Sequence, residues 1–397
     1  MQTTQTTSLR AGRQATFAFF LLNGFLMGMW IVHIPVIERR TGIGHAQLGW
    51  LLLLLGAGAF LGMRLAGPLT DRLGARRVLP VSAALCGAAV LLPGLAGDAP
   101  ALGAALLLLG LGNGTLDVSM NAHAVQVERG YGRPLMSAFH AAFSVGGVLA
   151  ALAGALALGR GWSPATTLGI TAAGSLVVTA LAARLLLPHT PTGPDPTATA
   201  PSTASPRRIR ILAGLAFLLM LCEGVANDWS TPHLKDVLGA SAGTAALAYG
   251  AFATAMTVGR LFADRVSGRF GPAAVLRVGS AVGAGGLALA ALAPNAPVAL
   301  AGWAVLGAGL SGCVPQLFSA AGHADPDAAG ANVSRVAGLG YLGMLAGPAV
   351  IGPLTHLVPL DLALLLPVAL CLVVTAASGI LTGAAAQDAA PVSRRTG

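Results

Sequence analysis

The sequence predicts an all-α membrane protein with twelve transmembrane helices, arranged as two six-helix halves related by a pseudo-two-fold axis along the membrane normal. Two observations carry this prediction. Hydrophobic residues make up 55% of the 397 residues and charged residues only 9%, against roughly 25% charged in soluble domains. The sequence also aligns with itself when it is shifted by 197 residues, which places Gly74 on Gly271. Such a duplication is typical of membrane proteins built from two similar halves.

The repeat is clearest where residues 61–79 fall on residues 258–276 without a gap, with six of the 19 positions identical. The same shift places Pro35 on Pro232 and Ser137 on Ser334. The candidate functional residues Asp117 and His140 do not repeat, since they fall on Val314 and Ala337. The halves are therefore expected to share a scaffold and to differ in their polar residues.

A spanning helix needs about 20 mostly apolar residues, and each half supplies six such stretches. The twelve predicted spans are 15–37, 46–69, 77–97, 100–124, 135–158, 164–187, 209–231, 243–263, 273–293, 298–320, 334–357 and 361–385. Residues 188–208 are rich in Pro, Thr, Ser and Ala and are predicted to be a flexible linker. The predicted domains are thus 1–187 and 209–397, joined by this linker.

Charge predicts the orientation in the membrane. With the N-terminus inside, the cytoplasmic segments carry 19 of the 23 Lys and Arg residues, as the positive-inside rule requires. Both termini and the linker are therefore predicted to be cytoplasmic in a multi-pass protein of the cell membrane. The first apolar stretch is too long for a signal-peptide core and is predicted to be a retained span.

Several classes of function are disfavoured by the same residues. The basic residues lie in short loops rather than on one face or tail, which disfavours nucleic acid as a partner. The four cysteines lie in apolar stretches without metal-ligand spacing, and no phosphate-binding P-loop is present in the sequence. We therefore expect no enzyme activity, no metal and no cofactor, and a monomer in the lipid bilayer.

One segment of the first half resembles a known signature. The segment Gly67-Pro-Leu-Thr-Asp71-Arg72-Leu-Gly74-Ala-Arg76-Arg77 resembles the loop 2–3 motif of the major facilitator superfamily. Its counterpart in the second half carries Arg260, Asp264 and Arg269, with the acid seven residues before the glycine instead of three. The resemblance covers the whole chain and implies a transporter that works by alternating access.

The motif has a physical interpretation. Glycine lets helices pack closely, and the carboxylate of Asp71 can cap a helix N-terminus across the interface of the halves and pair with an arginine. Contacts of this kind would exist in one access state and break in the other. The alternative is a basic loop that only sets topology and happens to contain one acid.

Within the superfamily, the chain most resembles the fucose-permease-like branch and related bacterial inner-membrane transporters of unknown substrate. The resemblance is carried by Gly112-Asn113-Gly114 with Asp117 and Asn121, by Met136-Ser137 with His140, and by Glu223-Gly224 with Asp228-Trp229-Ser230. The resemblance implies an acid at the place of Asp117 and a polar fifth-span position at His140. This chain differs in its first span, which has Trp30 and no acid before Glu38.

Three acids lie within predicted spans and are the candidate proton-coupling residues: Asp117, Glu223 and Asp228. An ionised carboxylate in hydrocarbon is costly, so each should face a cavity or a partner. Helical spacing groups further polar and aromatic side chains into stripes. The candidate substrate-binding residues are Asn23, Trp30, Asn113, Asn121, Ser137, His140, Asn227, Gln316 and Tyr341. The alternative is that the asparagines and serines only hold spans together by hydrogen bonds.

The sequence favours a secondary transporter that couples a small polar or amphipathic solute to protons by symport, with Asp117 or Glu223 carrying the proton and His140 binding the solute. A proton-coupled exporter is the alternative. The glycine- and proline-rich stretch that marks the fifth span of drug exporters falls here at 338–352, in predicted span eleven. A membrane sensor that binds without transporting is a third interpretation, which the intramembrane acids and the intact motif disfavour.

Overall fold

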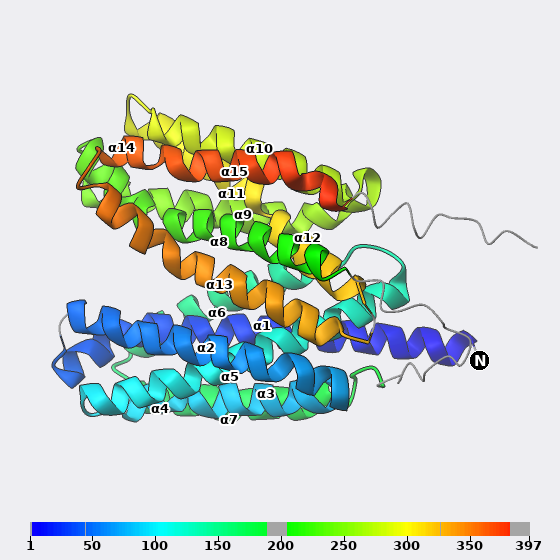
Figure 1. The fold of residues 1–397 in the computed structure, drawn as a ribbon. Helices are drawn as coiled ribbons and strands as arrows, with labels where there is room; N and C mark the ends of the chain where they lie inside the picture. The colour runs from blue at the N-terminus through cyan, green and yellow to red at the C-terminus, as the bar shows by residue number, and fades with distance from the viewer. Residues whose placement is uncertain (1, 44, 189–204, 326, 382–397) are drawn as a thin grey trace, which may run out of the picture. The chain divides into compact units, whose positions relative to one another are not determined.

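The computed structural model describes residues 2–43, 45–188, 205–325 and 327–381 (Figure 1). Every regular element within these ranges is helical. Contacts divide the chain into two compact units, which we call unit 1 (Met1–Thr203 and Ala321–Tyr341) and unit 2 (Ala204–Ala320 and Leu342–Gly397). Residues 189–204 of the predicted linker, 188–208, lie outside the described residues, and its last three residues, 206–208, are helical as the start of the next helix. The two halves predicted from the repeat, 1–187 and 209–397, describe the duplicated sequence, and their boundaries stay a prediction.

Unit 1 contains seven helices from the first half of the described chain, and the labels of Figure 1 are used throughout. They are α1 (Gln2–Thr41), α2 (His45–Leu73), α3 (Ala75–Ala89), α4 (Leu91–Leu95), α5 (Ala99–Tyr131), α6 (Met136–Gly159) and α7 (Pro164–Ala183). Helix α2 packs along α5, α1 packs along α6, and α3 lies against α5 and α7. The segment Ala321–Tyr341 joins this unit from the other half of the sequence.

Unit 2 holds the remaining elements. They are α8 (Pro206–Pro232), a π-helical turn η1 (His233–Val237), α9 (Ala242–Phe270), α10 (Pro272–Ala291), α11 (Ala296–Leu310), α12 (Cys313–His323), α13 (Ala329–Leu354), α14 (Leu360–Ala363), α15 (Leu365–Ala377) and a 3-10 turn η2 (Ser378–Leu381). The C-terminal end of α12 and the first half of α13 belong to unit 1. Helix α10 packs against α11 and α15, and α9 packs against α11.

Eleven stretches of the described chain are long and apolar enough to cross a membrane. Short elements combine in some of them, so that α3 with α4 forms the span Ala75–Leu95, and α11 with α12 forms Ala296–His323. The span predicted at 243–263 lies in α9, which is helical over 29 residues but is rich in alanine, glycine and threonine and is not among the eleven. A multi-pass helical membrane protein is confirmed, whereas the count of twelve and the pseudo-two-fold axis remain predictions.

The 197-residue repeat reappears in the local backbone geometry. Gly74 and Gly271 precede α3 and α10 with φ of 80° and 84°, a conformation that glycine adopts without strain. Asp98 accepts a hydrogen bond from Ala101 N at the start of α5, and Asn295 accepts one from Val298 N at the start of α11. These are N-caps, so the repeated residues begin equivalent helices in the same way.

Glycine permits the close approach of α2 and α5. A Cβ atom on Gly114 would lie 2.0 Å from the carbonyl oxygen of Ala59, well inside van der Waals contact. Both partners at this point are backbone, so neither can give way by changing a rotamer. The α2–α5 pair therefore depends on the missing side chain.

Gly114→Ala is expected to destabilise unit 1 by about 1–3 kcal/mol through overpacking. Thermal unfolding of the purified protein in detergent measures this loss. Gly174→Ala in α7 is the matched control, because a Cβ there meets nothing within 4 Å. Equal melting temperatures for the two variants would contradict the packing argument.

Candidate functional site

Asp117 lies at the centre of a polar cluster inside unit 1. Helix α5 buries it, with only 3% of its surface exposed. Asn121, one turn later, donates from Nδ2 to the Asp117 carbonyl (2.9 Å) and lies 3.4 Å from its Oδ1. Tyr341 from α13 is a hydrogen-bonding neighbour of the same carboxyl, whereas Oδ2 has no hydrogen-bond partner among the described residues. A buried carboxylate with an open oxygen is poised to take a proton or a ligand.

Asn121 also connects Asp117 to helix α6. Its Oδ1 lies 3.3 Å from His140 Nε2, and because an amide oxygen only accepts, this nitrogen of the histidine carries the proton. The His140 ring packs edge-on against Phe20 of α1, with 5.1 Å between ring centroids. The predicted stripes of α5 and α6 therefore meet at Asp117, Asn121 and His140.

Two asparagines of unit 1 leave buried oxygens open. Asn23 and Asn113 are 1% and 7% exposed, and the Oδ1 of each has no hydrogen-bond partner among the described residues. Asn23 Nδ2 lies 3.9 Å from the sulfur of Met120. Trp30 is 2% exposed and belongs to the hydrophobic core of unit 1. Ser137 is fully buried. Unsatisfied buried acceptors of this kind are open to a donor from a ligand or a water molecule.

In unit 2 the predicted acid Glu223 has a basic partner. Arg260 Nη2 of α9 lies 3.8 Å from Glu223 Oε1 of α8, and the side chains are 14% and 16% exposed. This distance between nitrogen and oxygen is longer than a hydrogen bond. The two side chains therefore attract each other by charge, without a direct hydrogen bond between these atoms. We did not pair these residues from the sequence. The pairing matters because a carboxylate in a span needs compensation, and Arg260 supplies it.

The other predicted residues of unit 2 are more dispersed. Gln316 is 3% exposed, and its Oε1 accepts a hydrogen bond from Ser267 Oγ at 2.9 Å. Asp228 is exposed and Asn227 partly exposed on α8. Asp264 lies one turn beyond Arg260 on α9, and the exposed Arg269 stacks over Phe270, 5.4 Å from the ring centroid. These residues of unit 2 do not form a polar cluster like the one around Asp117.

The glycine–acid motif of the first half is mostly helical, with Gly67, Asp71 and Arg72 in the last turns of α2. Asp71 Oδ1 accepts from Gly330 N (2.7 Å) and Oδ2 from Ala331 N (2.9 Å). These amides belong to the first turn of α13, where backbone N–H groups lack intrahelical partners. Gly74 separates α2 from α3, and Arg76 and Arg77 are exposed in the first turn of α3. Asp71 therefore caps the N-terminus of α13, and the sequence predicted that this carboxylate could cap a helix.

His123 is a buried polar residue that we did not single out from the sequence. The Leu187 amide donates to its Nε2 (3.1 Å), so Nδ1 carries the proton and donates to Thr16 Oγ1 (2.9 Å). Thr16 in turn donates to the Gly12 carbonyl. This chain of bonds ties the segment after α7 to α5 and α1, which is a structural role. The sequence feature that could have pointed to this residue is a single histidine within an apolar stretch.

A helical membrane protein with paired charges, a buried acid and a helix-capping motif between spans has the features of a transporter. The comparisons agree: the chain belongs to the Major Facilitator Superfamily, whose family model matches residues 16–348 and 212–395. An uncharacterized MFS-type transporter of Yersinia pestis is 35% identical over 364 residues, covering 91% of this chain and 94% of the relative. An uncharacterized transporter of Sinorhizobium fredii is 36% identical, covering 85% and 90%.

Solved structures share this fold at low sequence identity. The outward conformation of FucP has a TM-score of 0.77 with 16% identity, covering 92% of this chain and 97% of that one. The human organic anion transporter MFSD10 has a TM-score of 0.73 with 18% identity, covering 93% and 99%. The proton:xylose symporter XylE has a TM-score of 0.73 with 14% identity, covering 94% and 95%. The resemblance to the superfamily is confirmed, and the chain has the fold of its multi-pass transporters.

Proposed function

We propose that this protein is a proton-coupled symporter of a small polar or amphipathic solute, with Asp117 as the coupling acid. The observation that carries the proposal is the buried Asp117 carboxyl with one open oxygen, linked through Asn121 to His140. We further propose that it acts as a monomer in the cytoplasmic membrane, with both termini inside. Relatives of the same fold are named as a fucose:proton symporter of E. coli and a proton:xylose symporter, which supports proton coupling.

The three candidate acids differ in their surroundings, and the difference favours Asp117. Arg260 compensates the charge of Glu223, and Asp228 is exposed on α8. No charged side chain is among the groups that act on the Asp117 carboxyl in the part of the chain that the structure describes. An acid without a counter-charge in a low-dielectric span gains most from taking up a proton.

The solute is proposed to bind on the His140 side of Asp117. Asn23 and Asn113 contribute open oxygens, and Asn121, His140 and Tyr341 contribute groups that can donate or accept. Neutral hydroxyls satisfy such a mixed set of donors and acceptors better than a fixed charge does. Ser137, Asn227, Gln316 and Trp30 remain secondary candidates for solute contact.

Proteoliposomes loaded with a pH-sensitive dye test the proposal without a labelled substrate. Sugars, polyols, carboxylates and organic cations are added one at a time, and a symporter acidifies the lumen when its solute enters. Acidification of the lumen during efflux of a preloaded solute, with protons entering as the solute leaves, would instead support the exporter. No solute-dependent proton movement with any member of the panel, together with solute flux that ignores an imposed pH gradient, would overturn proton coupling.

The contact of Asp71 with α13 is proposed to bias the transport cycle. Two charge-assisted hydrogen bonds hold the first turn of α13 against α2, and Ser334 Oγ donates to the Met63 carbonyl at 2.6 Å beside them. Breaking them frees the segment 321–341 from the rest of unit 1. Arg72, Gly74, Arg76, Arg77, Arg260, Asp264 and Arg269 complete the proposed conformational motif.

Asp71→Asn is expected to weaken this contact by about 2 kcal/mol, because an amide offers one acceptor where the carboxylate offers two. That corresponds to a roughly 30-fold shift toward the released state. Spin labels at the exposed positions of Arg64 and Asp327 report the distance between the segments in the membrane. Asp98→Asn, an exposed helix cap elsewhere in the unit, is the control. An unchanged distance distribution in Asp71→Asn would contradict the role.

A further inference from the structure

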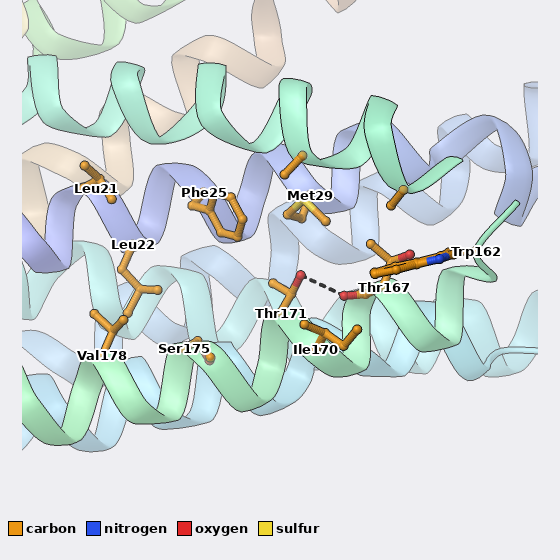
Figure 2. Close-up of a pocket in the computed structure, with 13 residues that line it drawn as sticks. Leu21, Leu22, Phe25, Met29, Trp162, Thr167, Ile170, Thr171, Ser175 and Val178 are labelled. Carbon is orange, nitrogen blue, oxygen red and sulfur yellow. Dashed lines mark hydrogen bonds between the residues drawn. The ribbon is translucent and has the colours of Figure 1, made fainter. Parts of the chain in front are cut away.

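A groove in unit 1 stands apart from the Asp117 cluster. It is a cavity of about 350 Å³ between α1, α6 and α7 (Figure 2), and no candidate substrate-binding residue lines it. Its walls are mainly apolar, with Phe25 and Met29 from α1 and Ile170 and Val178 from α7. Ile170 is 56% exposed and Val178 38%. Apolar side chains exposed on membrane spans contact hydrocarbon, so the groove opens to the bilayer.

The polar atoms of the groove are already satisfied by their own helix. Thr167 Oγ1 donates to the Ser163 carbonyl (3.1 Å), Thr171 Oγ1 to the Thr167 carbonyl (2.9 Å), and Ser175 Oγ to the Ala172 carbonyl (2.7 Å). Such back-bonding uses the hydroxyl proton, so these side chains have no donor left for a ligand. A polar solute would leave its acceptors unsatisfied here, whereas a hydrocarbon chain loses nothing.

The turn after α6 closes one end of the groove. The Trp162 ring lies there beside Thr167 (Figure 2), and the Trp162 amide donates to the Ala157 carbonyl at 3.0 Å to close the turn. Tryptophan is enriched at the boundary between hydrocarbon and head groups. Arg160, two residues earlier, is exposed. Arg160 is therefore the exposed cation of this turn, within two residues of the tryptophan that lines the groove.

We propose that this groove is a binding site for an anionic phospholipid, with one acyl chain in the groove and the head group at Arg160. Arginine pairs well with phosphate, and an exposed cation attracts the anionic head groups of the leaflet that it faces. An acyl chain is in hydrocarbon whether it is bound or free. Occupancy of the groove therefore depends on its shape, and preference for anionic lipid depends on Arg160. The site is independent of the function proposed above.

Tryptophan quenching by brominated lipids tests the proposal on the full-length protein. The protein is reconstituted in phosphatidylcholine vesicles with a small fraction of brominated phosphatidylglycerol or brominated phosphatidylcholine. Subtracting the signal of Trp162→Phe isolates the quenching of Trp162. We expect phosphatidylglycerol to be enriched roughly fivefold at Trp162 over its bulk fraction, and phosphatidylcholine to follow its bulk fraction.

Three variants separate the two parts of the site. Arg160→Gln should bring quenching by phosphatidylglycerol down to the phosphatidylcholine level, whereas Arg184→Gln, which removes an exposed cation after α7, should not. Gly174→Leu should lower quenching by both lipids, because Gly174 lines the groove with open space beside it. Equal quenching of Trp162 by both lipids in the unmodified protein, or no effect of Arg160→Gln, would overturn the proposal. A misfolded Gly174→Leu leaves the arginine comparison to decide.

Discussion

Arg260→Gln is expected to lower the free energy of unfolding by about 3 kcal/mol. The change removes the counter-charge of Glu223 in a membrane span, so the carboxyl either stays ionised or takes up a proton, and both cost free energy. Removing one partner of a buried ion pair typically costs about 3–5 kcal/mol. The lower end of that range applies here, because the two groups lie 3.8 Å apart and both side chains retain some exposure. Denaturant-induced unfolding in mixed micelles measures the loss.

The double variant Glu223→Gln with Arg260→Gln is expected to recover most of that stability. Two neutral amides carry no uncompensated charge, and replacing a buried pair as a whole is often nearly neutral. Arg265→Gln on the same helix removes an exposed arginine and should change stability by less than about 0.5 kcal/mol. If the single and double variants were equally unstable, Arg260 would contribute through packing and not through the charge of Glu223.

The same pair has a consequence for transport. If Glu223 takes up a proton, Arg260 loses its counter-ion. Each of the two charges therefore stabilises the ionised form of the other. Asp117 has no such partner among the described residues. The two acids that the sequence presents as equivalent are therefore placed in different electrostatic surroundings by the fold.

Local features of the fold follow from the sequence to a large degree. The repeat predicts equivalent helix starts, and Asp98 with Asn295 and Gly74 with Gly271 have matching cap geometry. Helical spacing also places Asp117 and Asn121 on one face of α5. These features depend on neighbours within a few residues or on a single helix face, which a sequence pattern contains.

Long-range partners were less accessible to sequence reasoning. The pairing of Glu223 with Arg260 depends on the rotation of α8 against α9, and no spacing rule specifies that rotation. Trp30 is predicted to form an aromatic wall of the solute cavity, and that role stays a prediction. Its side chain lies among the hydrophobic core residues of unit 1, a placement that helical spacing does not specify. The segment Ala321–Tyr341 is grouped with unit 1, partly through bonds to Asp71 that span some 260 residues of sequence.

Asp117→Asn is expected to abolish accumulation of the solute driven by a pH gradient and to spare exchange of solute across the membrane. The amide cannot take up or release a proton in the physiological range, so the coupled step loses its carrier. It keeps the size of the carboxyl and one acceptor oxygen, so the link to Asn121 and the neighbourhood of Tyr341 can persist. Counterflow in proteoliposomes with and without an imposed pH gradient separates these two effects.

Asp228→Asn serves as the matched control, because it removes an acid of unit 2 that is exposed on its helix. It should retain accumulation driven by a pH gradient. Loss of accumulation in Asp228→Asn together with normal accumulation in Asp117→Asn would move the coupling acid to unit 2. Loss of both accumulation and counterflow in Asp117→Asn would assign the carboxyl to solute binding, since the cycle itself would then need its charge. The proposal stands only if Asp117→Asn loses accumulation driven by the pH gradient and keeps exchange of the solute. A residue that carries the coupling proton is needed for accumulation, whereas exchange of the solute can proceed without its charge.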